Sequence, residues 1–276
     1  MNALYSGLPN LNQIVVQYLT LLGLCSIRLL VVMIVFPPTS DSVIQGTTIR
    51  NGLAAIWSSV VAYGQQAVMP EMHGMFLVEV GLKEALIGLV IGYAASAVFW
   101  AAESAGTYID DLTGYNNVQM TNPTDGQQAT LTSTLLSQFA IAAFWLLGGM
   151  TFLLGTIYDS YRWWPLDSMT PVPSVVIESF VLHQSDSLMQ TVAKLAAPVM
   201  MALLLVDIGF GLAAKVSQKL DVTTLSRPVK GMMTVFMLAL LVGVFVDQVR
   251  DQLALTGLSA EARAMAPGTA KSGQTK

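Results

Sequence analysis

The sequence predicts an all-α protein that is embedded in a membrane. Of its 276 residues, 54% are hydrophobic and 11% are charged, and the mean hydropathy is +0.60. Soluble domains carry about 25% charged residues, so a soluble fold of this size would not cover its surface with so few charges. In addition, several stretches approach the roughly 20 apolar residues that a membrane-spanning helix needs.

Six stretches of the chain are candidate spans. The first contains Arg28 and ends at a Pro-Pro pair, and the second is half polar because serine and glutamine interrupt it. The third is free of charge from residue 85 onward, the fourth carries no charge at all, and the fifth contains Asp207. In chain order the stretches cover residues 14–36, 53–69, 76–102, 131–158, 195–214 and 231–246. We expect residues 1–250 to form one polytopic membrane domain and residues 251–276, rich in small and polar residues, to be a disordered tail.

Two features lie outside these spans. Residues 171–183 are apolar but too short to cross a bilayer, and the Tyr-Arg-Trp-Trp sequence at 161–164 is typical of the aromatic belt where a membrane meets water. We therefore expect 171–183 to lie at the interface or to re-enter the membrane. Within the third span, Gly88 and Gly92 stand four residues apart, a spacing that allows two helices to approach closely in any membrane bundle.

The connection between the last two spans carries Lys215, Lys219, Arg227 and Lys230 against a single aspartate. Cytoplasmic loops of membrane proteins are enriched in basic residues, so this connection should be cytoplasmic. Counting back through alternating spans places the loop at 104–130 on the same side, although it contains no Lys or Arg. We expect that loop to line a cavity within protein, where irregular polar backbone is tolerated at membrane depth.

Groups that could support catalysis are few. The single cysteine, Cys25, lies in an apolar run, and the two histidines do not form an HExxH pair. Asp110 and Asp111 are adjacent, so on a helix their side chains point about 100° apart and do not converge on one atom. We therefore expect neither an enzyme nor a cofactor, and the net charge of −4 argues against a nucleic-acid partner.

Asp207 lies deep in the fifth span, where an unpaired charge is expensive. Two interpretations stay open: a hydrogen bond to another subunit, or a place on an ion or substrate path. A secondary transporter or channel subunit would use Asp207 as its coupling group, although the inverted repeats of such transporters are not visible here. Residues 115–128 are rich in Tyr, Asn, Gln and Thr and contain no Lys or Arg. This composition suits either a loop that forms hydrogen bonds to many neighbours or an ordinary exterior loop.

Residues 84–123, EALIGLVIGYAASAVFWAAESAGTYIDDLTGYNNVQMTNP, contain a Gly-xxx-Gly helix, an Ala-Gly pair, a later glycine and an Asn-Pro ending. This pattern resembles the T-subunit family of type III secretion export apparatus (SctT/FliR), in which an acid stands in place of Asn122. Two further stretches resemble the same family. Within residues 26–50, Pro37 and Arg50 resemble its early Pro and Arg. Residues 207–230, DIGFGLAAKVSQKLDVTTLSRPVK, resemble its last loop, with Gln218-Lys219 replacing Pro-Gln; the LSRPVK ending resembles the injectisome branch more than the flagellar one.

The resemblance implies a bacterial inner-membrane protein whose tilted helical hairpins form part of a hetero-oligomeric export gate for unfolded secreted proteins. Members occur as one copy beside five R-type and four S-type subunits, and look like an R-type part (here about 1–187) fused to an S-type hairpin (about 188–250). The loop after the third helix, about 106–128, would plug the channel, and glycines would let it bend. The implied plug residues are Gly106, Asp110, Gly114, Tyr115, Asn116, Asn117, Met120 and Pro123.

The resemblance also implies that the cytoplasmic hairpin meets a U-type switch protein at the channel entrance. The residues expected to make that contact are Lys215, Lys219, Arg227, Pro228 and Lys230. Helix packing within the assembly is expected at Gly88, Gly92 and Asp207. The sequence thus predicts a core subunit of type III protein secretion, with a transporter as the alternative.

Overall fold

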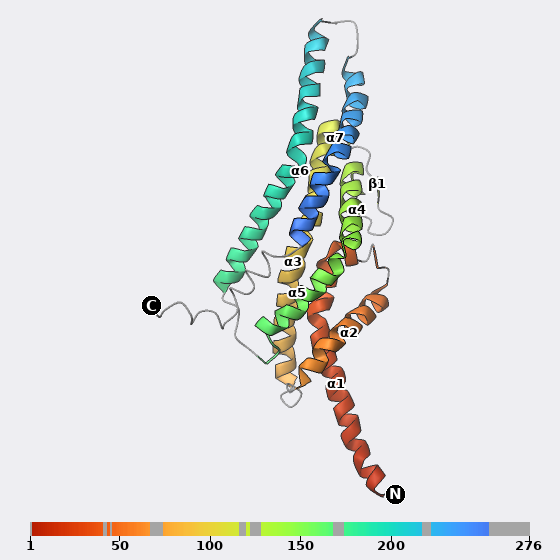
Figure 1. The fold of residues 1–276 in the computed structure, drawn as a ribbon, viewed down its shortest axis with the longest axis vertical. Helices are drawn as coiled ribbons and strands as arrows, with labels where there is room; N and C mark the ends of the chain where they lie inside the picture. Colours follow the sequence, from red (N-terminus) through yellow and green to blue (C-terminus); the bar gives the residue numbers. More distant parts are fainter. Residues whose placement is uncertain are drawn as a thin grey trace, which may run out of the picture. The chain divides into compact units, whose positions relative to one another are not determined.

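The computed structural model describes residues 2–40, 43–44, 46–66, 74–115, 120–121, 128–167, 174–216 and 222–253. Over these residues the fold is all-α, as predicted, apart from a two-residue antiparallel ladder in which Met120 pairs with Ala129 and Thr121 with Gln128. The strands are β1 (Met120–Thr121) and β2 (Gln128–Ala129), and a 3-10 helix covers Pro37–Thr39. The α-helices are α1 (Asn2–Val35), α2 (Thr47–Gly64), α3 (Gly74–Thr113), α4 (Leu131–Leu146), α5 (Gly149–Trp163), α6 (Ser174–Val216) and α7 (Val222–Leu253) (Figure 1).

Two helix ends follow directly from the residue types. α1 ends at Val35, just before the Pro37-Pro38 pair that opens the 3-10 helix, because proline lacks an N–H donor and disfavours helical backbone in the residue before it. α3 ends at Thr113 because Gly114 adopts a φ of +80°, a conformation that glycine takes at little cost. The Gly114 N–H then bonds to the Asp110 carbonyl at 3.0 Å, as in a left-handed helix cap.

Two predicted spans were wrong in their boundaries. The third does not end at residue 102: α3 continues to Thr113, because Glu103 and the following polar residues lower hydropathy without breaking a helix. The predicted fourth span, 131–158, is two helices, because Gly148 adopts a φ of +70° between α4 and α5. At this break the ring of Phe144 lies against Gly149, where an added Cβ would overlap the ring.

The prediction of a separate interfacial piece at 171–183 was also wrong. Its described part, from Ser174 onward, is the beginning of α6, which runs for 43 residues to Val216 and includes the predicted fifth span. Polar residues such as Ser185 and Asp186 divide the apolar stretches in the sequence but remain helical in the structure. α7 extends to Leu253, so the first residues of the predicted tail are helical, and residues 254–276 lie outside the described ranges.

Three helices in the described part of the chain are long and apolar enough to cross a membrane: Asn12–Val35, Gly74–Thr113 and Ser185–Val216. The pair formed by α4 and α5 would add a fourth crossing if the two helices together make one broken span. α2, which holds residues 53–64 of the second predicted span, and α7, which contains the sixth, do not meet the same test over the described residues. Over the described residues, the structure therefore supports a multi-pass membrane protein with three or four conventional crossings, against six candidate spans in the sequence.

The chain folds into two compact units. The first contains Met1–Ser96 and Thr151–Ser179, and the second contains Ala97–Met150 and Phe180–Ala254. In the second unit, Ile109 of α3 and Val199 and Leu203 of α6 form a buried cluster. Leu136 of α4 and Met233 of α7 pack against this cluster, and Figure 1 shows α4 and α7 running side by side. The second half of α3 and three other helices thus share one apolar core.

Candidate functional site

The structure places the predicted plug residues on both sides of a helix boundary. The prediction that Gly106 and Asp110 lie in a loop was wrong: both belong to α3. The helix continues past them because the first residue with a positive φ is Gly114. Gly114 and Tyr115 begin the connection from α3 to α4, and Met120 lies in β1. The predicted plug residues outside the described ranges are Asn116, Asn117 and Pro123.

Asp110 holds the two ends of this connection together. Its carboxylate is fully buried and accepts hydrogen bonds from the backbone N–H of Thr132, at 2.7 Å, and from the Thr132 hydroxyl. Its backbone carbonyl accepts the N–H of Gly114. Thr132 lies in the first turn of α4, where N–H groups lack partners within the helix and the helix dipole favours a carboxylate. One residue therefore fixes both the end of α3 and the start of α4.

Gly106 allows α3 and α4 to come together beside this contact. A Cβ atom built on Gly106 would overlap the backbone of Thr132 and Ser133, so a larger residue would force the two helices apart. The sequence suggested that Gly106 lets a loop bend. In the structure it lies within a continuous helix and serves close packing instead.

Lys230 of α7 contacts the same end of α3. Its Nζ lies 2.6 Å from Oδ1 of Asp207 on α6 and donates a hydrogen bond to the carbonyl of Leu112 at 2.9 Å. Leu112 is in the last turn of α3, where carbonyls lack helical partners and a nearby cation is favourable. Asp207, predicted to be a packing residue, is therefore one half of an ion pair that joins α6 to α7.

The neighbours of Lys230 on α7 face the first residues of the α3–α4 connection. Gly231 lies against the phenol of Tyr115, so that an added Cβ would overlap the hydroxyl oxygen. Nε of Arg227 lies 3.8 Å from the position that a Cβ of Gly114 would occupy. Two of the predicted plug residues, Gly114 and Tyr115, thus lie beside the turn of α7 that carries Arg227 and Lys230.

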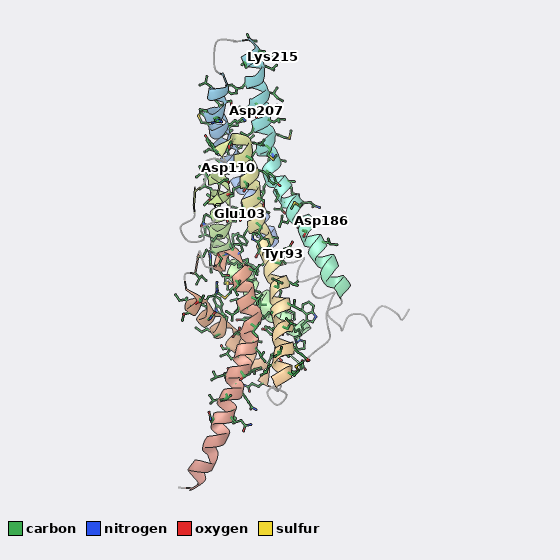
Figure 2. All side chains as sticks on the ribbon, turned by 180° about the vertical axis from the view of Figure 1, so that it is seen from behind. Tyr93, Glu103, Asp110, Asp186, Asp207 and Lys215 are labelled. Carbon is green, nitrogen blue, oxygen red and sulfur yellow. The ribbon has the colours of Figure 1, made fainter. Side chains whose placement is uncertain are left out.

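The predicted contact residues of the α6–α7 hairpin differ in exposure. Lys215, Arg227 and Pro228 are exposed, whereas the side chain of Lys230 is only 12% exposed and is held by the contacts above. Pro228 lies inside α7 and not in a turn, and Lys219 lies outside the described residues. Figure 2 shows Asp207 and Lys215 on the part of α6 that leads to α7.

A buried ionic network joins α1, α3 and α5 in the first unit. Arg28 and Glu84 are both fully buried and form a two-pronged pair, with Nε–Oε2 and Nη2–Oε1 distances of 2.8 and 2.9 Å. Arg28 also donates hydrogen bonds to the Ser160 hydroxyl at 2.6 Å and to the Trp164 carbonyl at 3.1 Å. Its guanidinium lies over the Tyr161 ring, 3.7 Å from the centroid. These contacts satisfy a charge that would otherwise be unstable in an apolar interior.

Close packing of α3 against α1 brings the network together. A Cβ on Gly88 would lie 2.5 Å from the carbonyl oxygen of Arg28, and one on Gly92 would lie 3.2 Å from Cα of Val32. The sequence singled out these glycines but treated Arg28 only as an interruption of an apolar run. The signal that could have found Glu84 is that a charge within an apolar helix needs a partner.

Within each unit, buried or partly buried charges bind partners of the same unit: Arg28 pairs with Glu84 in the first, and Lys230 with Asp207 in the second. Among the described residues, no group of three or more His, Cys, Asp or Glu side chains is placed to hold a metal ion. Cys25 is buried, and its carbonyl accepts a hydrogen bond from the Tyr161 hydroxyl at 2.8 Å. The arrangement is suited to holding helices and a connecting segment in a defined position.

Comparison with known proteins gives a consistent result. Residues 19–256 match the family described as bacterial export proteins, family 1. The Yop proteins translocation protein T of Yersinia pestis is 31% identical over 205 residues, which are 74% of this chain and 78% of that protein. The secretion system apparatus protein SsaT of Salmonella typhimurium is 28% identical over 227 residues, 80% of this chain and 86% of that protein. The flagellar biosynthetic protein FliR of Bacillus subtilis is 28% identical over 185 residues, 67% and 70% of the two chains.

Proposed function

Because this chain belongs to the bacterial export proteins, family 1, we propose that it is a core subunit of the export apparatus of a type III protein-secretion system. The names of its relatives support this proposal, since they include translocation, secretion-apparatus and flagellar biosynthetic proteins. The LSRPVK sequence at 225–230 favours an injectisome over a flagellar export apparatus. The location would be the bacterial inner membrane, in keeping with the apolar helices of the structure.

In this proposal the chain is one copy in an assembly with five R-type and four S-type subunits, and unfolded secreted proteins pass through the channel that they form. Residues 1–187 would correspond to an R-type subunit and residues 188–250 to an S-type hairpin. The exposed Lys215 and Arg227, at the ends of α6 and α7 that face the connection between them, would meet a U-type switch protein.

The segment between α3 and α4, residues 114–130, would close the channel until export begins. The observation that carries this proposal is the position of Asp110, which bonds to Gly114 at one end of the segment and to Thr132 beyond the other. Because both ends are fixed to buried helices, the residues between them can be displaced without disturbing the helical core. Gates and lids are drawn from such locally displaceable segments.

The test is the ion conductance of the purified complex in planar lipid bilayers, with residues 115–121 deleted. We expect the deletion to raise the resting conductance to small ions, because the closed channel loses its plug. Native mass spectrometry of the wild-type and deleted complexes should give the same subunit composition, with several copies of two other small hydrophobic subunits. An unchanged conductance would contradict the plug, and a monomer without such subunits would contradict the export-apparatus function itself.

A further inference from the structure

We propose that α2 crosses the membrane beside α1 and that lipid acyl chains cover its exposed apolar face. This crossing is additional to the three or four that length and composition indicate for the described residues. The proposal concerns the contact of the chain with the bilayer and does not depend on the export function.

The first argument is that α2 exposes large apolar side chains and buries small and polar ones. Ile56, Val60 and Tyr63 are 66%, 65% and 74% exposed. The buried positions recur every four residues along the opposite face: Arg50, Ala54, Ser58 and Ala62. A helix at the surface of a soluble protein shows the reverse pattern, with its apolar stripe turned to the core. The pattern of α2 is that of a helix whose outer surroundings are apolar.

The second argument is that the polar groups of α2 lie where a lipid-facing helix tolerates them. Arg50, the single charged residue of the helix, is 8% exposed, so its charge is turned away from the outer face. The Ser59 hydroxyl donates a hydrogen bond to the Ile56 carbonyl at 2.6 Å, so its donor is satisfied within the helix. The other exposed polar side chains are near the two ends of the helix, at Thr47, Thr48 and Asn51 and at Tyr63.

The third argument is that α2 has the length and the setting of a crossing. Its 18 residues extend about 27 Å at 1.5 Å per residue, close to the roughly 30 Å of a hydrocarbon core. It packs against α1, whose residues Asn12–Val35 are apolar enough to cross a membrane (Figure 1). The Tyr158 hydroxyl of α5 also holds it, through a hydrogen bond to the Trp57 carbonyl at 3.0 Å. Because α1 exposes apolar side chains of its own, such as Leu19 and Ile34, lipid around α1 also reaches α2.

The fourth argument is that the exposed face of α2 lacks what a partner helix in a membrane needs. Helices associate there through small residues, which allow close backbone approach, or through polar side chains. The small residues in the middle of α2 are on its buried face, whereas its exposed middle carries the branched side chains of Ile56 and Val60. α6 differs, because Gly209 and Gly211 are exposed on it, with nothing within 4 Å of an added Cβ. We therefore expect a partner subunit on α6 and lipid on α2.

The first experiment uses the wild-type chain with its native partners, reconstituted in a bilayer that contains a phospholipid with a photoactivatable diazirine on an acyl chain. Mass spectrometry of the digested chain should find adducts on Ile56 and Val60 and none on Ala54 or Ser58. Adducts on α1 without adducts on α2 would show that protein or water covers the face, and the proposal would be wrong.

The second experiment measures the surroundings and the depth of single positions with a nitroxide on an introduced cysteine. The native Cys25 is fully buried, so the wild-type protein is the reference for background labelling. We expect Ile56→Cys and Val60→Cys to be several-fold more accessible to oxygen than to a water-soluble nickel chelate. The depth should be greatest at Ile56 and should decrease toward Asn51→Cys and Tyr63→Cys, because a crossing helix approaches water at both ends.

Each other outcome has a defined meaning. Low accessibility to both reagents at positions 56 and 60 would place a protein partner on this face, and high accessibility to the nickel chelate would place water there, so either result overturns the proposal. Equal depth from Asn51 to Tyr63 would show a helix in the plane of the bilayer and overturn the crossing. Native mass spectrometry of the same samples tests the export function separately, because a chain without R-type and S-type subunits can still have lipid at α2.

Discussion

Arg28 shows how a single charge is accommodated inside an apolar helix. Its guanidinium has a carboxylate, a hydroxyl, a carbonyl and an aromatic ring as neighbours, which come from α3, α5 and the residues just after α5. Each partner restricts the position of the others, because the planar guanidinium donates its hydrogen bonds in fixed directions. Arg28 therefore joins α1 to α3 and α5, which are far apart in the sequence.

Removing the partner of Arg28 should be strongly destabilising. We expect Glu84→Ala to lower the free energy of unfolding by about 3–5 kcal/mol, because it leaves a buried guanidinium without its counter-charge. Glu79→Ala, at an exposed position of the same helix, should change it by less than about 0.5 kcal/mol. Unfolding of the purified protein in mixed detergent and dodecyl sulfate measures both values.

The double variant Arg28→Met, Glu84→Leu distinguishes pairing from packing. With both charges replaced by apolar side chains, much of the lost stability should return, since no charge is left buried and unpaired. A double variant as unstable as Glu84→Ala would contradict this account and would point to the Ser160 and Trp164 contacts of Arg28 as the main source of stability.

At the scale of helices, glycines determine how closely elements approach. Gly88 and Gly92 bring α3 to the backbone of α1, and Gly106 brings α3 to the backbone at the start of α4. Close backbone contact at small residues is the main source of specific helix association in membranes, where apolar side chains gain little by leaving lipid. α3 therefore uses glycines at different heights to contact α1 and α4.

Two glycines of α3 provide a matched comparison. A Cβ on Gly88 would lie 2.5 Å from the backbone oxygen of Arg28, whereas one on Gly81 would lie 3.5 Å from the flexible end of Ile27. We expect Gly88→Ala to lower the unfolding free energy by about 1–3 kcal/mol through overpacking. Gly81→Ala should raise it by up to about 1 kcal/mol, because alanine is the better helix former. Equal effects in the same unfolding assay would contradict the close contact.

Helix existence was predictable, and several helix ends were not. The Pro37-Pro38 pair predicted the end of α1 well, because proline ends a helix by its own chemistry, whereas α1 begins at Asn2 and not at the predicted residue 14. Glu103 was interpreted as the end of the third span, but a polar residue changes solvation and not backbone preference. For the same reason, the sequence-based prediction divided α6 into two elements. It also missed the break at Gly148, because a hydropathy profile does not report a positive φ.

At the scale of the whole molecule, the sequence singled out some of the residues that contact one another in the second unit, but not the contacts between them. Gly114 and Tyr115 were assigned to one loop, and Arg227 and Lys230 to another. The hydrogen bond from Lys230 to Leu112 joins residues 118 positions apart, and no local pattern encodes such a contact. The family resemblance gave the function expected of these residues, while the physical link between them required three-dimensional structure.

The apolar surface of α6 predicts how the isolated chain behaves. Only 22% of its most apolar window is buried within the protein, against 67% for α3. Expressed alone, the chain should accumulate to a level several-fold lower than when co-expressed with the neighbouring subunits of its export apparatus, because partner helices would cover this surface. Quantitative immunoblotting of a tagged chain measures the difference, and equal levels would indicate that lipid alone covers α6.

The way in which Asp110 joins Gly114 to Thr132 has a consequence for evolution. With its ends already held together, a segment that grows from n to 2n residues loses only about 0.6 kcal/mol in closure entropy. Insertions and deletions between these two points therefore change the stability of the bundle very little. We therefore expect relatives of this chain to differ more in the length and composition of this segment than in the helices that carry it.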